Sequence, residues 1–354
     1  PNPGAGGGGP YWCGFFVQAP WRTYVNYNDP RLIEKYYSQM KEWFKYVDKY
    51  TVDGLLKRWP DTKYRDWYLG DWLAPMGVDA GNQASVDLVS NCFISECLST
   101  MYKTAITLGK REEAEEFAIR REKLNKLIHQ TFYRADEGIY STGSQLDMCY
   151  PMLVGVVPDS LYNKVKENVV AMTEEKYKGH IAVGLVGVPI LTEWAVRNKQ
   201  VDFFYQMMKK RDYPGYLYMI DHGATATWEY WSGERSRVHN CYNGIGTWFY
   251  QAVGGIRLDE AEPGYRHFYV DPQIPNGVTW VKVTKESPYG TIAVNWELQG
   301  NQLNLQLTVP AGTTATVCIP NNAVSCKKNK KKVSVKEQTV DVEAGHYDFL
   351  FNLK

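Results

Sequence analysis

The sequence predicts a mainly helical domain, an (α/α) barrel, followed by an antiparallel β-sandwich. Apolar residues recur with helical periodicity from about residue 30 to residue 255. The pattern changes at Gly254-Gly255-Ile256, and beyond Pro263-Gly264 apolar and polar residues alternate with a period of two. We therefore expect a helical domain over residues 1–256 and a β-sandwich over residues 257–354.

Helices are expected throughout the first part, joined by short polar connections. The first long one follows Asp29-Pro30 and has apolar residues at the spacing of one helix face. Residues 83–108 read as an amphipathic helix that ends at Gly109, a typical C-cap. Residues 110–131 carry Glu early and Arg or Lys late, which suits the helix dipole on a solvated outer helix. Further helices are expected at residues 160–173, 188–197, 201–209 and 242–253.

The strands of the second part follow from alternation and turns. Residues 292–298 place their apolar side chains on one face, and Gly300-Asn301 turns the chain into residues 303–309. Further strands are expected at residues 316–319, 333–335 and 347–351. The basic run Lys327–Lys332 fits an exposed hairpin tip that protects a sheet edge better than it fits a polyanion site.

Composition excludes several classes of function. A formal charge of +1 over 354 residues gives no general case for nucleic acid or an anionic membrane. No apolar run approaches the ~20 residues of a membrane span. The seven Cys form no metal-type pattern, no nucleotide motif is present, and we expect no metal and no cofactor. Most Cys are expected to be buried, with Cys318–Cys326 as the one disulfide considered.

Residues 221–250 contain the strongest candidate for chemistry. Trp228, Glu229 and Trp231 fall within four residues, after a run of small residues. Burying an unpaired carboxylate between indoles is costly. The same arrangement suits a sugar site, where aromatic faces cover the ring and a carboxylate moves a proton at the anomeric centre. The alternative is a Trp-rich core edge with Glu229 in a surface ion pair.

Two upstream stretches repeat the aromatic theme and favour the sugar site. Residues 59–72 bring Trp67, Asp71 and Trp72 just before a long helix, and residues 9–21 end at Trp21. Loops on a rigid helical scaffold are the usual carriers of binding residues. Three such loops ahead of helices are what an (α/α) barrel with a cleft at one rim requires.

At these loops the chain resembles the α-L-rhamnosidases of glycoside hydrolase family 78. The matching stretches are GGGGPYWCGFFVQAPW, LGDWLAP at 69–75, ATATWEYWSG and the start of the segment 239–250; VGGIRLDEAEPGYRHFYVDP, SPYGTIAVNWEL and LTVPAGTTATVCIP match the family's closing β-domain. The resemblance covers nearly the whole chain in order. It implies an (α/α)6 barrel followed by a β-sandwich, and inverting hydrolysis of terminal α-L-rhamnosides.

The resemblance also implies residue roles. Glu229 falls on the family's general base, and Asp71 and Trp72 fall on the loop that lines the sugar subsite. Trp21 matches an aromatic residue of the same pocket, and His239 matches a histidine that hydrogen-bonds the sugar. Rhamnose-containing oligosaccharides or glycosides are the expected partners, without nucleic acid or membrane insertion.

Two departures from the family pattern stand out. The family's general acid belongs to a motif before the GGGGP loop, where this sequence starts, so we expect a piece of a longer polypeptide whose barrel lacks its first helices here. Such a barrel would expose apolar surface and favour reduced stability or a homo-oligomer. The second departure is Gly14, where an acidic residue is expected.

Alternatives remain for single residues. His239 could be a satisfied core histidine, and Asp71 could cap the helix that follows it. Asp66 is an extra carboxylate on the same loop, while Glu234 belongs to a surface cluster and His180 to the structural part of the fold.

Alternatives also remain for the whole chain. A non-catalytic rhamnose- or carbohydrate-binding protein, another inverting (α/α)6 glycosidase, a polysaccharide lyase and a helical interaction scaffold rank below the rhamnosidase. A periplasmic or secreted location is favoured over a cytoplasmic one.

Overall fold

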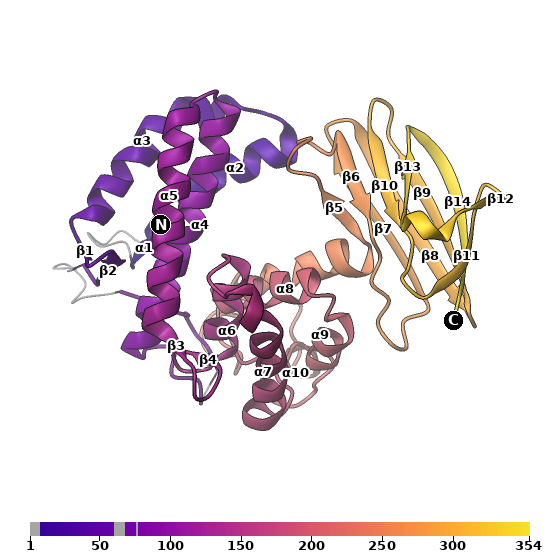
Figure 1. Ribbon diagram of the computed structural model, residues 1–354. Coiled ribbons are helices and arrows are strands. Elements are labelled where there is room, and N and C mark those ends of the chain that lie inside the picture. The colour runs from indigo at the N-terminus through magenta and orange to yellow at the C-terminus, as the bar shows by residue number, and fades with distance from the viewer. Residues whose placement is uncertain (1–7, 60–67, 76) are drawn as a thin grey trace. The chain divides into compact units, whose positions relative to one another are not determined.

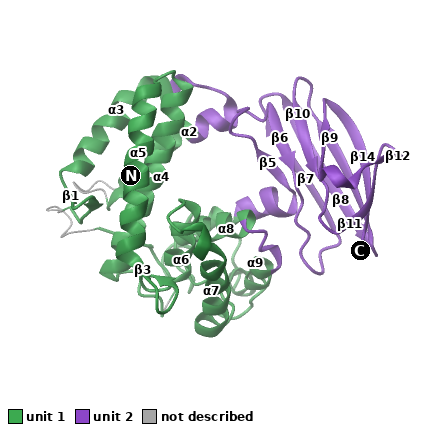
Figure 2. Ribbon diagram, viewed as in Figure 1, with its two compact units in different colours: residues 1–21, 33–197, 203–245 green, residues 22–32, 198–202, 246–354 purple. Residues whose placement is uncertain are grey.

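The computed structural model describes residues 8–59, 68–75 and 77–354 (Figure 1). The chain divides into two compact units (Figure 2). Unit 1 comprises residues 1–21, 33–197 and 203–245, and unit 2 comprises residues 22–32, 198–202 and 246–354. The two main parts are a helical part and a β part, as the sequence predicts.

Helices carry the part of the chain before residue 246. They are α1 (Pro10–Cys13), α2 (Phe15–Tyr27), α3 (Arg31–Asp48), α4 (Gln83–Thr107), α5 (Arg111–Phe132), α6 (Gln145–Leu153), α7 (Asp159–Tyr177), α8 (Gly187–Arg197), α9 (Val201–Met208) and α10 (Tyr216–Asp221). Two short hairpins interrupt them, β1 (Thr51–Val52) with β2 (Leu55–Leu56) and β3 (Tyr133–Arg134) with β4 (Ile139–Tyr140).

Helix α4 is the central element of unit 1. It buries side chains around its whole circumference, so it is an inner helix rather than the amphipathic one that its sequence suggested. Helices α3 and α5 each bury one stripe and expose the rest, which confirms the solvated face of α5. The side chain of Asn82 accepts a hydrogen bond from the amide of Ala84 at 2.9 Å and caps the start of α4. Gly109, with φ 73°, follows its end as predicted.

The helix expected at residues 242–253 forms, but it is irregular. The segment is helical from residue 243 to residue 253, starting as a 3-10 turn, η1 (Asn243–Ile245), and ending as a π-helical turn, η2 (Trp248–Val253). Gly244 and Gly246 lie inside it, and glycine in a helix interior disfavours a regular α-helix. Gly244 also packs so closely on Pro189 that a Cβ there would lie 2.8 Å from the proline ring's Cα.

Unit 2 holds two sheets. The four-stranded sheet has the order β13-β10-β6-β5, and the six-stranded sheet has the order β12-β11-β14-β9-β8-β7. The strands are β5 (Ile256–Leu258), β6 (His267–Val270), β7 (Trp280–Ser287), β8 (Gly290–Gln299), β9 (Gln302–Val309), β10 (Thr314–Cys318), β11 (Ala323–Lys328), β12 (Lys331–Val333), β13 (Thr339–Val342) and β14 (Gly345–Leu353). All pairs are antiparallel except β6 with β10, which is parallel. The strand expected at residues 333–335 ends at Val333, before the 3-10 turn η3 (Val335–Glu337).

The predicted alternation places the core of unit 2. On β8, Ile292, Val294 and Trp296 are buried, while the residues between them lie on the opposite face. The indole N–H of Trp296 donates to the carbonyl of Val253 at 2.8 Å. Gly300, with φ 56°, makes the expected turn into β9.

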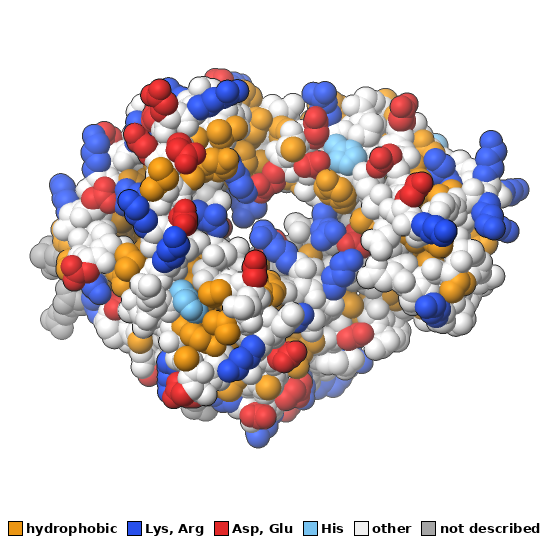
Figure 3. Space-filling model, in the orientation of Figure 1, with side chains coloured by type: hydrophobic (Ala, Val, Ile, Leu, Met, Phe, Trp, Pro, Cys, Tyr) orange, Lys and Arg blue, Asp and Glu red, His pale blue; other side chains and the backbone are white. Residues whose placement is uncertain are grey.

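The cysteines are free thiols, so the disulfide considered between Cys318 and Cys326 is wrong. The two lie on strands of different sheets. Within the described ranges, no helix combines the length and apolarity that a membrane crossing needs. Those ranges also contain no group of three or more His, Cys, Asp or Glu residues that could hold a metal ion. Charges of both signs are interspersed over the face seen in Figure 3.

Candidate active site

Glu229 lies near the base of a closed turn formed by residues 227–239. The amide of Glu229 donates to the carbonyl of Ser236 at 2.9 Å, and the amide of His239 donates to the carbonyl of Thr227 at 2.8 Å. These two bonds join the arms of residues 227–239. Gly233, with φ 80°, makes the bend. The backbone hydrogen bonds of the turn therefore fix the position of the Glu229 Cα, from which the carboxylate side chain extends.

The two indoles beside Glu229 are supports of this turn rather than exposed sugar platforms. Trp228 is 1% exposed, and Gly233 packs on its ring so closely that a Cβ would lie 2.7 Å away. Trp231, also 1% exposed, stacks on Tyr242 with ring centroids 4.0 Å apart and donates to the carbonyl of Val183 at 2.9 Å. For these two side chains the core-edge alternative is correct.

The carboxylate of Glu229 is half-buried and lightly bound. One oxygen accepts a long hydrogen bond, 3.4 Å, from the amide of Ser236. It forms no ion pair with any residue that the structure describes, so the alternative of a surface ion pair is wrong for the described residues. A half-buried carboxylate without a cation leaves an oxygen available to orient a water molecule.

Asp71 is buried and anchors its loop to the start of α8. One carboxylate oxygen accepts from the amide of Gly184 at 2.6 Å, and the other accepts from the amides of Val186 and Gly187 at 3.0 and 2.9 Å. These amides belong to the segment that leads into α8, where the helix dipole favours a negative charge. Burial nevertheless prevails, and the pKa of Asp71 rises to about 6 while the three amides oppose the rise.

The alternative that Asp71 caps the following helix is wrong. Asn82 caps α4, and Asp71 binds the start of a helix more than a hundred residues further along the chain. Both of its oxygens are already occupied by backbone amides. Its direct contact with a sugar hydroxyl stays a prediction, and the geometry gives it the role of a positioning residue.

Further contacts join the loop at 69–75 to the loops around Glu229. The carbonyl of Trp72 accepts from the amide of Leu185 at 2.8 Å, and the hydroxyl of Tyr242 donates to the carbonyl of Leu73 at 3.0 Å. A Cβ at Gly184 would lie 2.0 Å from the Trp72 carbonyl, so only glycine fits this approach. The two aromatic and acidic stretches found in the sequence therefore meet in space.

The carboxylates of Asp71 and Glu229 both act on the Cys241 thiol. Burial raises the pKa of the Cys241 thiol to about 12, and the carboxylates of Asp71 and Glu229 both add to the rise. Cys241 immediately precedes Tyr242, whose ring stacks on Trp231. Both carboxylates therefore lie within electrostatic range of the Cys241 thiol.

Trp72 offers an aromatic side chain at this point. Its ring is half-buried and meets Trp12 edge to face with centroids 6.5 Å apart. The amide of Leu69 donates to the carbonyl of Gly8 at 2.9 Å, which ties the first loop to the same cluster. Among the residues that the structure describes, Trp72 and Trp12 are the indoles near the cluster that retain exposed surface.

Trp21 lies elsewhere. It is buried on α2, and the ammonium of Lys103 lies 5.9 Å from its ring centroid. Gly70 faces Val86, near the other end of α4. Positions 86 and 103 are separated by about 25 Å along the helix axis at 1.5 Å per residue. The structure therefore does not bring Trp21 beside the loop at 69–75, and its place in a sugar pocket stays a prediction.

His239 combines a structural contact with a free edge. Its Nδ1 accepts from the amide of Cys241 at 3.0 Å, so a neutral ring carries its proton on Nε2. Nε2 has no partner among the residues that the structure describes. The alternative of a satisfied histidine holds for one nitrogen, and the other can donate to a ligand.

Gly14, the second departure from the expected pattern, has a physical reason. A Cβ there would lie 2.6 Å from the Phe93 ring, 2.7 Å from the carbonyl of Pro10 and 2.8 Å from the Trp43 ring. An aspartate at this position would have to displace these rings. Aromatic packing occupies the volume that an acidic side chain would need.

The remaining candidates are placed as follows. His180 is structural as predicted, because Nδ1 contacts the carbonyl of Pro214 at 2.8 Å and Nε2 lies 3.2 Å from Asp212. Glu234 is exposed, as expected for a surface residue. Asp66 and Trp67 lie outside the described residues.

The sequence reasoning missed the segment 183–187 as part of the site. Its signal was the pair of glycines at 184 and 187 ahead of a helix, which permits close approach of another backbone. It also missed Tyr216, whose hydroxyl donates to the carbonyl of Tyr242 at 2.8 Å and whose ring meets Trp231 edge to face.

Comparison with known proteins agrees with this architecture. Residues 1–253 match the family model of the bacterial alpha-L-rhamnosidase six-hairpin glycosidase domain, and residues 255–334 match the bacterial alpha-L-rhamnosidase C-terminal domain. The chain belongs to this family of six-hairpin glycosidase domains.

Curated proteins named alpha-L-rhamnosidase match this chain over nearly its whole length. An alpha-L-rhamnosidase of Alteromonas sp. (strain LOR) is 25% identical over 349 residues, which cover 93% of this chain and 36% of the relative. One of Formosa agariphila is 27% identical over 366 residues, covering 96% of this chain and 38% of the relative. The chain thus spans little more than a third of these relatives.

Solved structures show the same fold. The structure of a Streptomyces avermitilis alpha-L-rhamnosidase complexed with L-rhamnose matches with a TM-score of 0.86 at 23% identity, covering 97% of this chain and 33% of that one. An alpha-L-rhamnosidase from Dictyoglumus thermophilum matches with a TM-score of 0.87 at 20% identity, covering 97% and 40%. These likenesses establish the fold, a helical domain followed by a β domain.

Proposed function

We propose that the protein containing this chain is an inverting glycoside hydrolase that releases terminal α-L-rhamnose, with Glu229 as general base. The observation that carries the proposal is the Glu229 carboxylate, half-buried and without an ion pair among the described residues, on a turn held by two buried indoles. Family membership supports the substrate class, because the matching relatives are named alpha-L-rhamnosidases.

The chemistry assigned to Glu229 is activation of water. An ionised carboxylate accepts a proton from a water molecule as the water attacks the anomeric carbon from the face opposite the leaving group. The sugar product leaves with inverted configuration. The second carboxyl group that inversion requires, the general acid, would stand about 6.5–9.5 Å from the base. The resemblance assigns that acid to a motif that precedes the GGGGP loop.

The surrounding residues would bind and position. Trp72 offers an indole face beside the sugar, and the Nε2 proton of His239 would be donated to a sugar hydroxyl. Asp71 would hold the loop that carries Trp72 in place, because its carboxylate accepts from the backbone amides of residues 184, 186 and 187. Rhamnose-containing oligosaccharides or glycosides are therefore the proposed substrates.

A second candidate is non-catalytic binding of rhamnose. It is favoured by Asp71, because both of its carboxylate oxygens already accept from backbone amides and Asp71 is therefore not available as the second catalytic carboxyl group. Binding would need only the indole and the hydrogen-bonding groups.

Hydrolysis of an aryl α-L-rhamnoside by the complete polypeptide, with the anomer of the first-formed sugar read by NMR, separates the two. Release of the inverted anomer supports the hydrolase. Saturable rhamnose binding without release of the aryl group supports the binding protein, and a retained anomer would contradict the role given to Glu229.

A further inference from the structure

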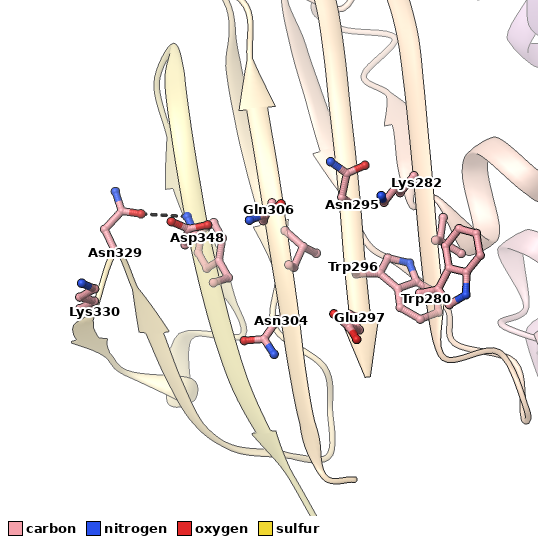
Figure 4. A pocket seen from close by; sticks show the side chains of 13 residues that line it. Trp280, Lys282, Asn295, Trp296, Glu297, Asn304, Gln306, Asn329, Lys330 and Asp348 are labelled. Atoms are coloured by element: carbon pink, nitrogen blue, oxygen red, sulfur yellow. Dashed lines mark hydrogen bonds between the residues drawn. The ribbon is translucent and has the colours of Figure 1, made fainter. Parts of the chain in front are cut away.

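The outward face of the six-stranded sheet in unit 2 carries a hollow of about 800 Å³, lined by residues that take no part in the candidate active site. Its open side chains come from the strands β7, β8, β9 and β14 and from the turn between β11 and β12 (Figure 4). The apolar side chains of these strands point to the other face and form the core. The hollow is thus built from the solvent-facing half of each strand.

Strand register sets the polar side chains in a line. Lys282, Asn295, Gln306 and Asp348 are consecutive cross-strand partners from β7 through β8 and β9 to β14. Figure 4 shows these four side chains following one another across the sheet. Neighbouring strands lie about 4.8 Å apart, so the line is about 14 Å long. That length suits an extended chain of several units rather than one small molecule.

A second line runs parallel to the first. Trp280, Glu297 and Asn304 are consecutive partners on β7, β8 and β9. The amide groups of Asn295, Asn304 and Gln306 hydrogen-bond to no other side chain that the structure describes. Side-chain amides present a donor and an acceptor side by side. These three side-chain amides can therefore form hydrogen bonds with ligand groups that both donate and accept, such as hydroxyls.

An exposed indole closes one end of the hollow. Trp280 is 63% exposed on the edge strand β7. Its apolar face and the neighbouring amides together offer one stacking surface and several hydrogen-bonding groups.

The other end of the hollow carries one lysine, Lys330, and one carboxylate, Asp348. Asn329 and Lys330 form the tip of the hairpin between β11 and β12, inside the run Lys327–Lys332. The amide of Asp348 donates to the side chain of Asn329 at 2.8 Å, which fixes the tip beside the line of polar residues.

We propose that this face binds a polysaccharide chain, laid across the strands with one sugar ring stacked on Trp280. Sugars combine apolar C–H faces with hydroxyls that donate and accept, which matches an indole followed by open amides. Lys282 and Lys330 are balanced in the hollow by Glu297 and Asp348, so an uncharged chain fits it as well as one that carries carboxylates. A protein partner or a second copy would need a central apolar anchor, and Trp280 at the sheet edge is the sole exposed large aromatic of the hollow among the described residues.

The test is affinity electrophoresis of the complete protein in native gels that contain galactomannan, which is uncharged, or polygalacturonate. Retarded migration is expected in at least one of the two gels. Trp280→Ala should weaken the retardation at least about fivefold, as loss of a stacking contact implies. Gln306→Ala should weaken it in the same gel.

Two controls isolate the surface. Tyr269→Ala removes an aromatic ring of similar size that is 37% exposed on β6, in the other sheet, and should leave retardation unchanged. Glu229→Gln should also leave it unchanged, which separates this surface from the proposed active site. The proposal is overturned by normal migration in both gels, or by equal losses for Trp280→Ala and Tyr269→Ala. The proposal is also overturned if the protein binds polygalacturonate but not galactomannan and Trp280→Ala leaves that binding unchanged. The lysines of the hairpin would then attract the polyanion by charge alone, without a stacking contact.

Discussion

Replacing Asp71 by Asn should remove a pH dependence of stability. The pKa of Asp71 is raised in the folded chain from 3.8 to about 6, chiefly because the carboxyl group is buried. Between these two values the folded state binds a proton that the unfolded state has lost. The contribution of Asp71 to stability is therefore full at low pH and is lost as the pH rises through 6.

The magnitude follows from the two pKa values. With 3.8 unfolded and about 6 folded, the contribution of Asp71 falls by about 1.3 kcal/mol between pH 5 and pH 7. Asn cannot titrate, so the gap in unfolding free energy between wild type and Asp71→Asn should shift by this amount. The unfolding free energy of the wild-type protein should rise relative to that of the variant as the pH falls.

Urea unfolding followed by tryptophan fluorescence at pH 5, 6 and 7 measures the gap. Asp136→Asn serves as the matched control, because Asp136 is exposed in the turn between β3 and β4 and its gap should stay constant. A gap for Asp71→Asn that stays constant, or that widens toward pH 7, would refute the reasoning. It would mean that the three backbone amides outweigh burial and hold the carboxylate ionised.

Three further substitutions test the neighbouring contacts. Gly14→Asp should lower the unfolding free energy by about 3 kcal/mol through overpacking and a buried charge; a loss below about 0.5 kcal/mol in a thermal unfolding series would show that the aromatic rings beside it yield. Tyr242→Phe removes the hydroxyl that binds the carbonyl of Leu73 and should cost about 1 kcal/mol by the same assay, so an unchanged value would argue against the loop contact. His239→Ala in the complete protein should raise KM for an aryl rhamnoside more than it lowers kcat, and an unaltered KM would exclude the sugar contact.

The parts of the fold that depend on local pattern could be predicted from the sequence. The strands β8 and β9 around Gly300 follow from alternation and turn chemistry. The bounds of the helix at Gln83–Thr107, with Gly109 after it, also agree with the sequence, although its amphipathic pattern does not. The convergence of the loop at 69–75 with the turn at Glu229 was also indicated, because both place aromatic residues and a carboxylate ahead of helices. The two loops do meet, through Tyr242 and Leu73.

What could not be predicted depends on contacts distant in the sequence. The partners of Asp71 lie at residues 184–187, and nothing local to Asp71 reveals that its charge will be bound by backbone amides. The burial of Trp228 and Trp231 likewise follows from how the turn folds over them, whereas their spacing alone suited an open platform equally well. The parallel pair β6–β10 depends on which strands meet across the sandwich.

The role of Glu229 is tested most directly by turnover of an aryl α-L-rhamnoside by the complete polypeptide carrying Glu229→Gln. Glu234→Gln is the matched control, an exposed carboxylate on the same turn. The account predicts that Glu229→Gln lowers kcat at least about a hundredfold, the typical contribution of a general base, while rhamnose binding measured by calorimetry is retained. Near-normal kcat for Glu229→Gln, or equal losses for the two variants, would contradict it.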